Sequence, residues 1–379
     1  MTLLDTMRSP AAPSRRKGQA SRARFRRRLA AVTVTAAALT AAGAVTPALA
    51  ATGPSMTANN GSVNIAVQGP NHSLRFYWAV NGTTTWHRET VAGAGSTFSA
   101  PSMTVNGNVV NIAAQGPNHS LRFYWAVNGT ATWHRETVAG AGSTFSAPSM
   151  TANNGSVNIA AQGPNHSLRF YWAVNGTATW HPETIAGSGA AYTAPSMTVN
   201  GNAVNIATIG FFSELRFYWA LNGTATWHEE HVANHVVSAP SMTANGNAVN
   251  IAAVGDAAPP RLLFFWAING TATWHAETIA STDNFSAPSM TANHGSVNIA
   301  IQGPGTRLRF FWAVNGTATW HPETVAGGSS TAAAPSMTVN GNVVNISTVG
   351  TFNQLKFFWA VNGTATWHPE TVAGPGSVA

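Results

Sequence analysis

The motif Trp-His-x-Glu contains the residues of this chain that are best suited to chemistry. A carboxylate beside an indole offers a fixed hydrogen-bond acceptor next to a flat apolar surface. Together these groups can hold a polyhydroxyl compound by its hydroxyls and its C–H face. The motif occurs seven times, as Trp86, His87 and Glu89; Trp133, His134 and Glu136; Trp180, His181 and Glu183; Trp227, His228 and Glu230; Trp274, His275 and Glu277; Trp320, His321 and Glu323; and Trp367, His368 and Glu370.

A basic residue lies in the Leu-Arg-Phe-Tyr-Trp segment that precedes most copies of the motif. A partly buried Glu on a strand has to be paired, and this arginine is its candidate partner. The pair is either a structural ion pair between neighbouring strands or the planar donor and fixed acceptor of a binding pocket. Lys356 replaces the arginine in the last repeat and Leu263 in the fifth, so the fifth site is expected to be weak or different. The arginines are Arg75, Arg122, Arg169, Arg216 and Arg309.

All 14 tryptophans are in register, as seven pairs eight residues apart. We expect one Trp of each pair to fill the core and the other to line a pocket. The second is the better pocket candidate, because polar and titratable residues surround it. The pairs are Trp78/Trp86, Trp125/Trp133, Trp172/Trp180, Trp219/Trp227, Trp266/Trp274, Trp312/Trp320 and Trp359/Trp367.

These motifs belong to an internal repeat of 45–48 residues, which dictates the architecture. The second repeat predicts strands over 101–105, 109–114, 121–127 and 132–138, joined by Asn-Gly turns and a Gly-Pro loop. Four strands per unit in seven units predict an all-β fold, a seven-bladed β-propeller of four-stranded antiparallel blades. A linear β-solenoid is less favoured, because the chain has no atypical capping repeats. The domain covers 51–379, with Pro-Ser-Met-Thr at Pro54, Pro101, Pro148, Pro195, Pro240, Pro288 and Pro335.

The sequence leaves two ways of closing the ring. In one, Pro-Ser-Met-Thr opens each blade, and the ring closes on whole blades. In the other, the segment 109–114 and its equivalents are innermost, and the copy of Pro-Ser-Met-Thr at Pro54 completes the last blade.

Residues 1–50 have the layout of a secretory signal peptide. A basic stretch ends at Arg28, a short Ala- and Thr-rich apolar run follows, and Ala48-Leu49-Ala50 fits a signal-peptidase site. We expect cleavage after Ala50 by the general route rather than the twin-arginine route, and a secreted, extracellular protein without membrane insertion. From Ala51 onward there are 10 basic and 11 acidic residues, so the net charge of +7 belongs to the leader. A basic surface for nucleic acid is therefore not supported.

The residue pattern argues against several chemistries. One His and one Glu per repeat are too few converging ligands for a metal, and no cofactor motif is present. A glycosidase needs a distinctive pair of carboxylates at one place, whereas the repeated Glu are identical. The Asn-Gly-Thr tripeptide matches a glycosylation acceptor but is better interpreted as a hairpin turn.

The seven repeats of about 47 residues, the Tyr-Trp strand, Trp-His-x-Glu and the Val-Ala-Gly-x-Gly-x-x-Phe-Ser-Ala-Pro-Ser link resemble the Photorhabdus-type seven-bladed propeller lectins over the whole of 54–379. The set of Arg, Glu and Trp is also similar in kind to that of the fungal six-bladed fucose lectins. This resemblance implies binding of fucose and related or O-methylated sugars between adjacent blades, and dimers or tetramers. The repeats depart from one another in the loops 209–214, 254–260 and 349–354, so those blades are expected to hold different ligands or none.

We therefore expect a non-catalytic, multivalent lectin for fucosylated or methylated glycans. The alternatives are a propeller glycosidase or lyase, for which the irregular acids and histidines around Glu229 and Glu230 are the only sign, and a protein-binding propeller, to which Phe211 and Phe212 could contribute an apolar patch.

Overall fold

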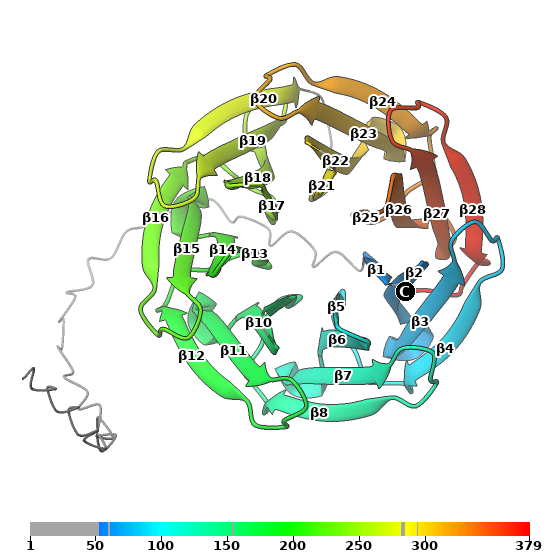
Figure 1. The fold of residues 1–379 in the computed structure, drawn as a ribbon, viewed down its shortest axis with the longest axis horizontal. Helices are drawn as coiled ribbons and strands as arrows, with labels where there is room; N and C mark the ends of the chain where they lie inside the picture. The colour runs from blue at the N-terminus through cyan, green and yellow to red at the C-terminus, as the bar shows by residue number, and fades with distance from the viewer. Residues whose placement is uncertain (1–52, 60, 154, 282–284, 294) are drawn as a thin grey trace, which may run out of the picture. The chain divides into compact units, whose positions relative to one another are not determined.

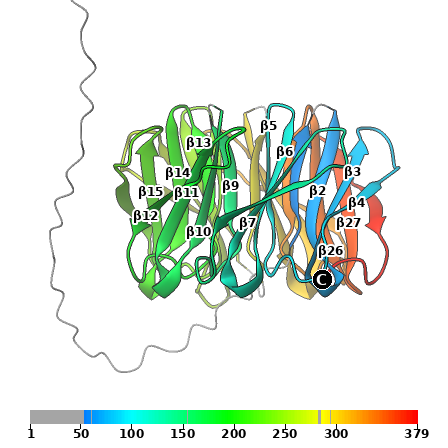
Figure 2. The same cartoon turned by 90° about the horizontal axis from the view of Figure 1, so that it is seen from below.

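The computed structural model describes residues 53–59, 61–153, 155–281, 285–293 and 295–379. These residues form seven four-stranded antiparallel sheets arranged as the blades of a ring, as Figures 1 and 2 show. The predicted seven-bladed β-propeller is confirmed. The predicted signal peptide, residues 1–50, lies outside the described residues. No helix in the described part is long and apolar enough to cross a membrane.

Each blade is a meander in which consecutive strands pair, from the innermost strand to the outermost. The innermost strands are β1 (Ser55–Asn59), β5 (Ser102–Asn106), β9 (Ser149–Asn153), β13 (Ser196–Asn200), β17 (Ser241–Asn245), β21 (Ser289–Asn293) and β25 (Ser336–Asn340). The second strands are β2 (Ser62–Gly69), β6 (Val109–Gln115), β10 (Ser156–Gln162), β14 (Ala203–Ile209), β18 (Ala248–Gly255), β22 (Ser296–Gly303) and β26 (Val343–Gly350). The third strands are β3 (Ser73–Val80), β7 (Leu121–Val127), β11 (Leu168–Val174), β15 (Leu215–Leu221), β19 (Arg261–Ile268), β23 (Arg307–Val314) and β27 (Gln354–Val361). The outer strands are β4 (His87–Ala92), β8 (His134–Ala139), β12 (His181–Ala186), β16 (His228–Ala233), β20 (His275–Ser281), β24 (His321–Ala326) and β28 (His368–Ala373).

Short 3₁₀ turns join the second strand to the third in five blades. They are η1 (Pro70–His72), η2 (Pro117–His119), η3 (Pro164–His166), η4 (Phe211–Ser213) and η5 (Pro304–Thr306).

The ring closes on whole blades. β1 pairs with β2 in the first blade, and β25 to β28 complete the last blade without it, so the alternative in which the N-terminus stitches the last blade is wrong. The regular recurrence of Pro-Ser-Met-Thr along the chain has a physical reason. Each Ser hydroxyl accepts a hydrogen bond from the Met backbone N–H of the following blade at 2.9 Å, and Ser336 does the same for Met56 across the closure.

The core consists of seven apolar clusters, one between each pair of neighbouring blades. Between blades 1 and 2, Leu74 and Phe76 on β3 pack against Met103, Ile112 and Tyr124. Burial of each such side chain contributes on the order of 1.5–3 kcal/mol. Because every cluster takes one half from each blade, a blade alone cannot bury its faces, and the strands depend on the ring.

The hairpin between the third and outer strands carries one wall of the candidate site. In blade 2 the Thr130 backbone N–H donates to the Val127 carbonyl at 3.0 Å, and the Thr130 hydroxyl donates to the same oxygen at 2.7 Å. Gly129 between them has φ +81°, which favours glycine. This geometry explains why Asn-Gly-Thr recurs, and it confirms the tripeptide as a turn.

Candidate functional site

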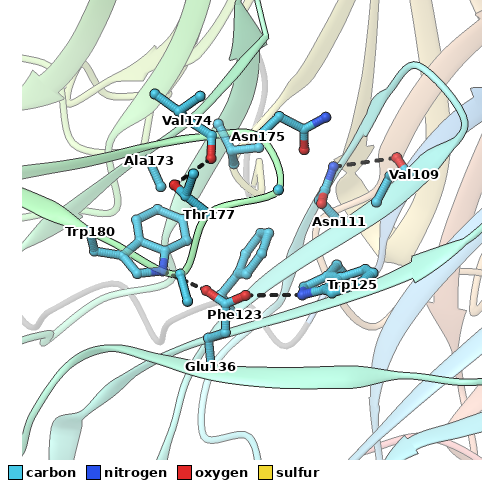
Figure 3. A pocket seen from close by; sticks show the side chains of 13 residues that line it. Val109, Asn111, Phe123, Trp125, Glu136, Ala173, Val174, Asn175, Thr177 and Trp180 are labelled. Carbon is cyan, nitrogen blue, oxygen red and sulfur yellow. Dashed lines mark hydrogen bonds between the residues drawn. The ribbon is translucent and has the colours of Figure 1, made fainter.

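Each Glu of the Trp-His-x-Glu motif joins two tryptophans from neighbouring blades. In Figure 3, Glu136 Oε1 accepts a hydrogen bond from Trp125 Nε1 of its own blade at 3.0 Å, and its Oε2 accepts one from Trp180 Nε1 of blade 3 at 2.8 Å. Hydrogen bonds to a charged acceptor are about twice as strong as neutral ones. The carboxylate thus fixes two indoles in place, and we call this arrangement the indole–carboxylate bridge.

The bridge recurs around the ring, including the junction of the last blade with the first. Five further complete bridges are Glu89 with Trp78 and Trp133, Glu183 with Trp172 and Trp227, Glu230 with Trp219 and Trp274, Glu323 with Trp312 and Trp367, and Glu370 with Trp359 and Trp86. In blade 5, Glu277 accepts from Trp320 at 2.8 Å.

Both tryptophans of a bridge line one pocket, so the predicted division into one core Trp and one pocket Trp does not hold. Trp180 meets Phe123 edge-on, with ring centroids 5.0 Å apart, and Trp125 stacks on His134 with centroids 4.0 Å apart. Both indoles are half-buried. Each Trp is anchored on one side and still offers surface to the pocket.

The pocket between blades 2 and 3 has a volume of about 280 Å³. Its floor holds Phe123, Trp125 and Glu136, and the hairpin 174–178 of blade 3 with Trp180 forms the opposite wall (Figure 3). Equivalent pockets of about 380 Å³ and 180 Å³ lie between blades 1 and 2 and between blades 6 and 7. Between blades 4 and 5 the space is only about 10 Å³. Pockets for drug-sized ligands have volumes of roughly 300–1,000 Å³, so the three larger pockets suit a group the size of one sugar ring.

An asparagine on the second strand of blade 2, Asn111, belongs to the site and was missed by the sequence reasoning. Asn111 lies on the floor of the pocket in Figure 3, opposite Trp125 in the strand pairing. Its six equivalents are Asn64, Asn158, Asn205, Asn250, Asn298 and Asn345, and each is paired in the same way with the first Trp of its blade. A polar residue recurring inside the apolar Val-Asn-Ile strand is the signal that could have found it.

Several of these asparagines carry unused hydrogen-bonding capacity. Among the described residues, the buried Nδ2 atoms of Asn64, Asn158, Asn250 and Asn298 have no hydrogen-bond partner. A buried donor without a partner costs free energy.

The predicted ion pair between the strand arginine and the motif Glu is wrong. In blade 2, Arg122 pairs with Thr137 and the next residue, Phe123, pairs with Glu136. Successive residues point to opposite faces of a strand, so Arg122 and Glu136 lie on opposite faces of the blade. Arg122 Nη1 donates to the Thr137 hydroxyl instead. The same register holds for Arg75, Arg169, Arg216, Arg309 and Lys356.

The reason for expecting a weak fifth site is therefore removed. Leu263 takes the place of an arginine that never meets the motif Glu, and Glu277 keeps its bond from Trp320.

The motif histidines lie on the face that also carries the Glu, as predicted from the alternation along the strand. Each is exposed and stacks on the first Trp of its own blade, with centroids 4.0–4.2 Å apart. They are His87, His134, His181, His228, His275, His321 and His368. In the part of the chain that the structure describes, no three His, Cys, Asp or Glu side chains gather in a way that could hold a metal.

The variable loops lie away from the pockets. In blade 5, the loop 254–260 precedes β19, whereas the pocket wall is the hairpin 268–271, which begins at the last residue of β19. A strand of seven residues spans about 23 Å. The differences at 209–214, 254–260 and 349–354 therefore do not reach the indole–carboxylate bridges.

No protein-family model and no curated protein matches the chain. Among solved structures it is similar to the lectin BP39L from Burkholderia pseudomallei, with a TM-score of 0.75 and 16% identity over 87% of this chain and 99% of that one. It is also similar to the SapL1 lectin in complex with α-methyl fucoside, with a TM-score of 0.55 and 11% identity over 75% and 99% of the two chains. An ulvan lyase gives a TM-score of 0.58 and 11% identity over 86% and 93%. At these identities the likeness is one of fold.

Proposed function

We propose that this protein is a secreted, multivalent carbohydrate-binding propeller that takes fucose or related O-methylated sugars in its inter-blade pockets. The observation that carries the proposal is the indole–carboxylate bridge, because it holds two aromatic surfaces and an acceptor at one pocket between neighbouring blades. The lectin folds of BP39L and SapL1 and the resemblance of the repeats to the Photorhabdus-type lectins support it.

The pocket chemistry fits a sugar with a methyl substituent. The apolar C–H face of the ring would pack on the indoles, and the methyl group would meet Val157, Ala173 and Val174 in the lining. A carboxylate has about four lone-pair positions, of which the indoles take two, so Glu136 can still accept from a sugar hydroxyl. Asn111 supplies a further polar group on the floor.

The irregular acids of blade 4, the one sign of an enzyme, are all engaged elsewhere. Glu229 is 2.7 Å from Arg216, and Glu230 holds two indoles. His231 contacts Asn234 at 2.9 Å, and His235 contacts Asp256 at 3.1 Å. Side chains that are tied in this way favour the binding function over glycosidase or lyase chemistry.

A glycan array probed with residues 51–379, followed by calorimetry with the best monosaccharide, tests the proposal. We expect binding of fucosylated or methylated glycans with several sites per chain and weak affinity per site, while clustered glycans gain roughly 10²–10⁴ by avidity. A folded protein that binds nothing on the array would refute the proposal. Sedimentation of the same sample tests the implied dimers or tetramers.

A further inference from the structure

One exposed position differs between otherwise similar blades and changes their charge. It is the residue between His and Glu in the motif, which faces the aromatic residue of the third strand. In blade order it is Arg88, Arg135, Pro182, Glu229, Ala276, Pro322 and Pro369. Repeats 1 and 2 each have a net charge of +1, whereas repeats 4 and 5 each have −2.

In blade 2, Arg135 joins Arg122 beside a buried tyrosine. Arg122 pairs with Thr137 and Tyr124 with Arg135, so both arginines lie on the same face of the sheet as diagonal neighbours across β7 and β8. Burial raises the pKa of Tyr124, and the charges of Arg135 and Arg122 act against that rise, which means that both guanidinium groups lie close to the phenol. Blade 1 repeats the arrangement with Arg75, Arg88 and Tyr77.

One arginine of each pair is held in place before any ligand arrives. The side chain of Arg122 lies over Gly116, where an added Cβ would come within 2.6 Å of its Cγ, and its Nη1 donates to the Thr137 hydroxyl. Arg135 is exposed to solvent. A held guanidinium group next to an exposed one suits a planar or tetrahedral anion.

These two pairs have no acidic partner. The ion pairs in the described residues are Arg216 with Glu214 at 2.6 Å, Arg216 with Glu229 at 2.7 Å, and His235 with Asp256 at 3.1 Å. In blade 4 two carboxylates thus neutralise Arg216, whereas the corresponding arginines of blades 1 and 2 have no carboxylate partner in the described part of the chain.

The arginine pair of blade 2 lies on the face of the sheet that is turned toward blade 1. Tyr124 packs in the cluster with Trp133 and Trp78, so its face of the sheet is turned toward blade 1. Arg135 follows Trp133 by two residues, which places it about 7 Å further along the same face. A sugar ring against Trp133 would have this guanidinium within reach of an acidic substituent.

We propose that two arginine pairs, Arg75 with Arg88 and Arg122 with Arg135, bind the anionic group, a carboxylate or a sulfate ester, of an acidic glycan. They lie on the faces of blades 1 and 2 that are turned toward blades 7 and 1. This inference rests on the proposed function for the binding of the sugar ring, whereas the binding of the anion does not depend on it. It makes the seven sites unequal: two attract acidic glycans, and blade 4 does not.

Calorimetry with a heparin-derived tetrasaccharide at low ionic strength tests this site in the chain 51–379. We expect the double variant Arg88→Ala/Arg135→Ala to bind it at least about tenfold more weakly, while Arg216→Ala binds it like the unmodified protein. Pro182→Arg places a second arginine beside Arg169 and should add a site. The desulfated tetrasaccharide, and the same backbone with its carboxyls also reduced, separate the contributions of sulfate and carboxylate.

Binding of α-methyl fucoside by the same variants separates this proposal from the proposed function. Tetrasaccharide binding that is lost with the two arginines supports the anion site when fucoside binding is kept in the double variant, and also when the unmodified protein binds no fucoside. Unchanged tetrasaccharide affinity in the double variant overturns it. Equal loss of both ligands in the double variant also overturns it, since the arginines would then support the whole pocket rather than an anion.

Discussion

Replacing Glu136 by Gln tests the indole–carboxylate bridge directly. The carboxylate accepts from Trp125 at 3.0 Å and from Trp180 at 2.8 Å, so both of its oxygens serve as acceptors. The amide of Gln has one acceptor oxygen and one NH₂ group, and the NH₂ group would face an indole N–H, donor against donor. The variant therefore breaks one of the two bonds while keeping the size of the side chain.

The magnitude follows from the type of bond. A hydrogen bond to a charged group contributes about 1.5–3 kcal/mol, and the surviving bond falls to the neutral value of about 0.5–1.5 kcal/mol. Since the side chains are half-buried, water replaces part of the loss, and we expect a destabilisation of about 2 kcal/mol. For a chain of this size that lowers the Tm by about 3 °C.

Thermal unfolding and calorimetry of residues 51–379 measure both consequences. We expect Glu136→Gln to lower the Tm and to remove one sugar site, the pocket between blades 2 and 3. Glu277→Gln is the matched control. In the described part of the chain, Glu277 accepts from one indole, that of Trp320, and Gln keeps an oxygen for it, so the loss should be about 1 kcal/mol or less.

An unchanged Tm and an unchanged number of sites in Glu136→Gln would show that the bridge neither joins the blades nor shapes the pocket. An equal loss in both variants would show instead that the charge, and not the second indole bond, is what matters.

Three further predictions follow from individual contacts. Ser102→Ala removes the hydroxyl that accepts a hydrogen bond from the Met150 N–H at 2.9 Å. We expect the free energy of unfolding in urea to fall by about 1 kcal/mol and the Met150 amide hydrogen to exchange faster. An unchanged exchange rate would argue against the Ser–Met hydrogen bonds between the innermost strands. Asn158→Leu removes a buried amide whose Nδ2 has no partner in the described residues, so the Tm should stay constant or rise; a clear fall in Tm would contradict this. Burial, with Glu229 as the next cause, raises the pKa of Tyr218 to about 12. The stability that depends on this raised pKa is complete below the unfolded pKa of about 10 and is lost as the pH rises from there through about 12. Tyr218→Phe should therefore lose less stability over that pH range when unfolding is measured as a function of pH. An identical pH profile in the variant would refute the assignment.

The sequence alone was sufficient for the architecture because every local signal repeats seven times. The Asn-Gly turns, the β-branched second strand and the aromatic third strand specify the same meander in each unit, and one such unit cannot bury its faces alone. The strands predicted at 109–114 and 121–127 agree with β6 and β7 within one residue.

The site was predicted in its members but not in their partners. Trp180 and Glu136 were both candidates, yet their hydrogen bond joins two blades, and the sequence does not show which residues meet across a ring. The error over Arg122 has a similar cause. Its pairing with Thr137 depends on the register of β7 with β8, and a shift of one residue moves a side chain to the other face of the sheet.

What the sequence determined by itself is therefore the number of blades, the strands within each and the residue types offered to a ligand, since these depend on local propensity and periodicity. The tertiary structure alone decided the closure of the ring, through Ser336 and Met56, and the pairing of each Glu with the indole of the next blade. The physical reason is that identical repeats make every local signal equivalent. Only the geometry of the closed ring determines which surfaces face each other.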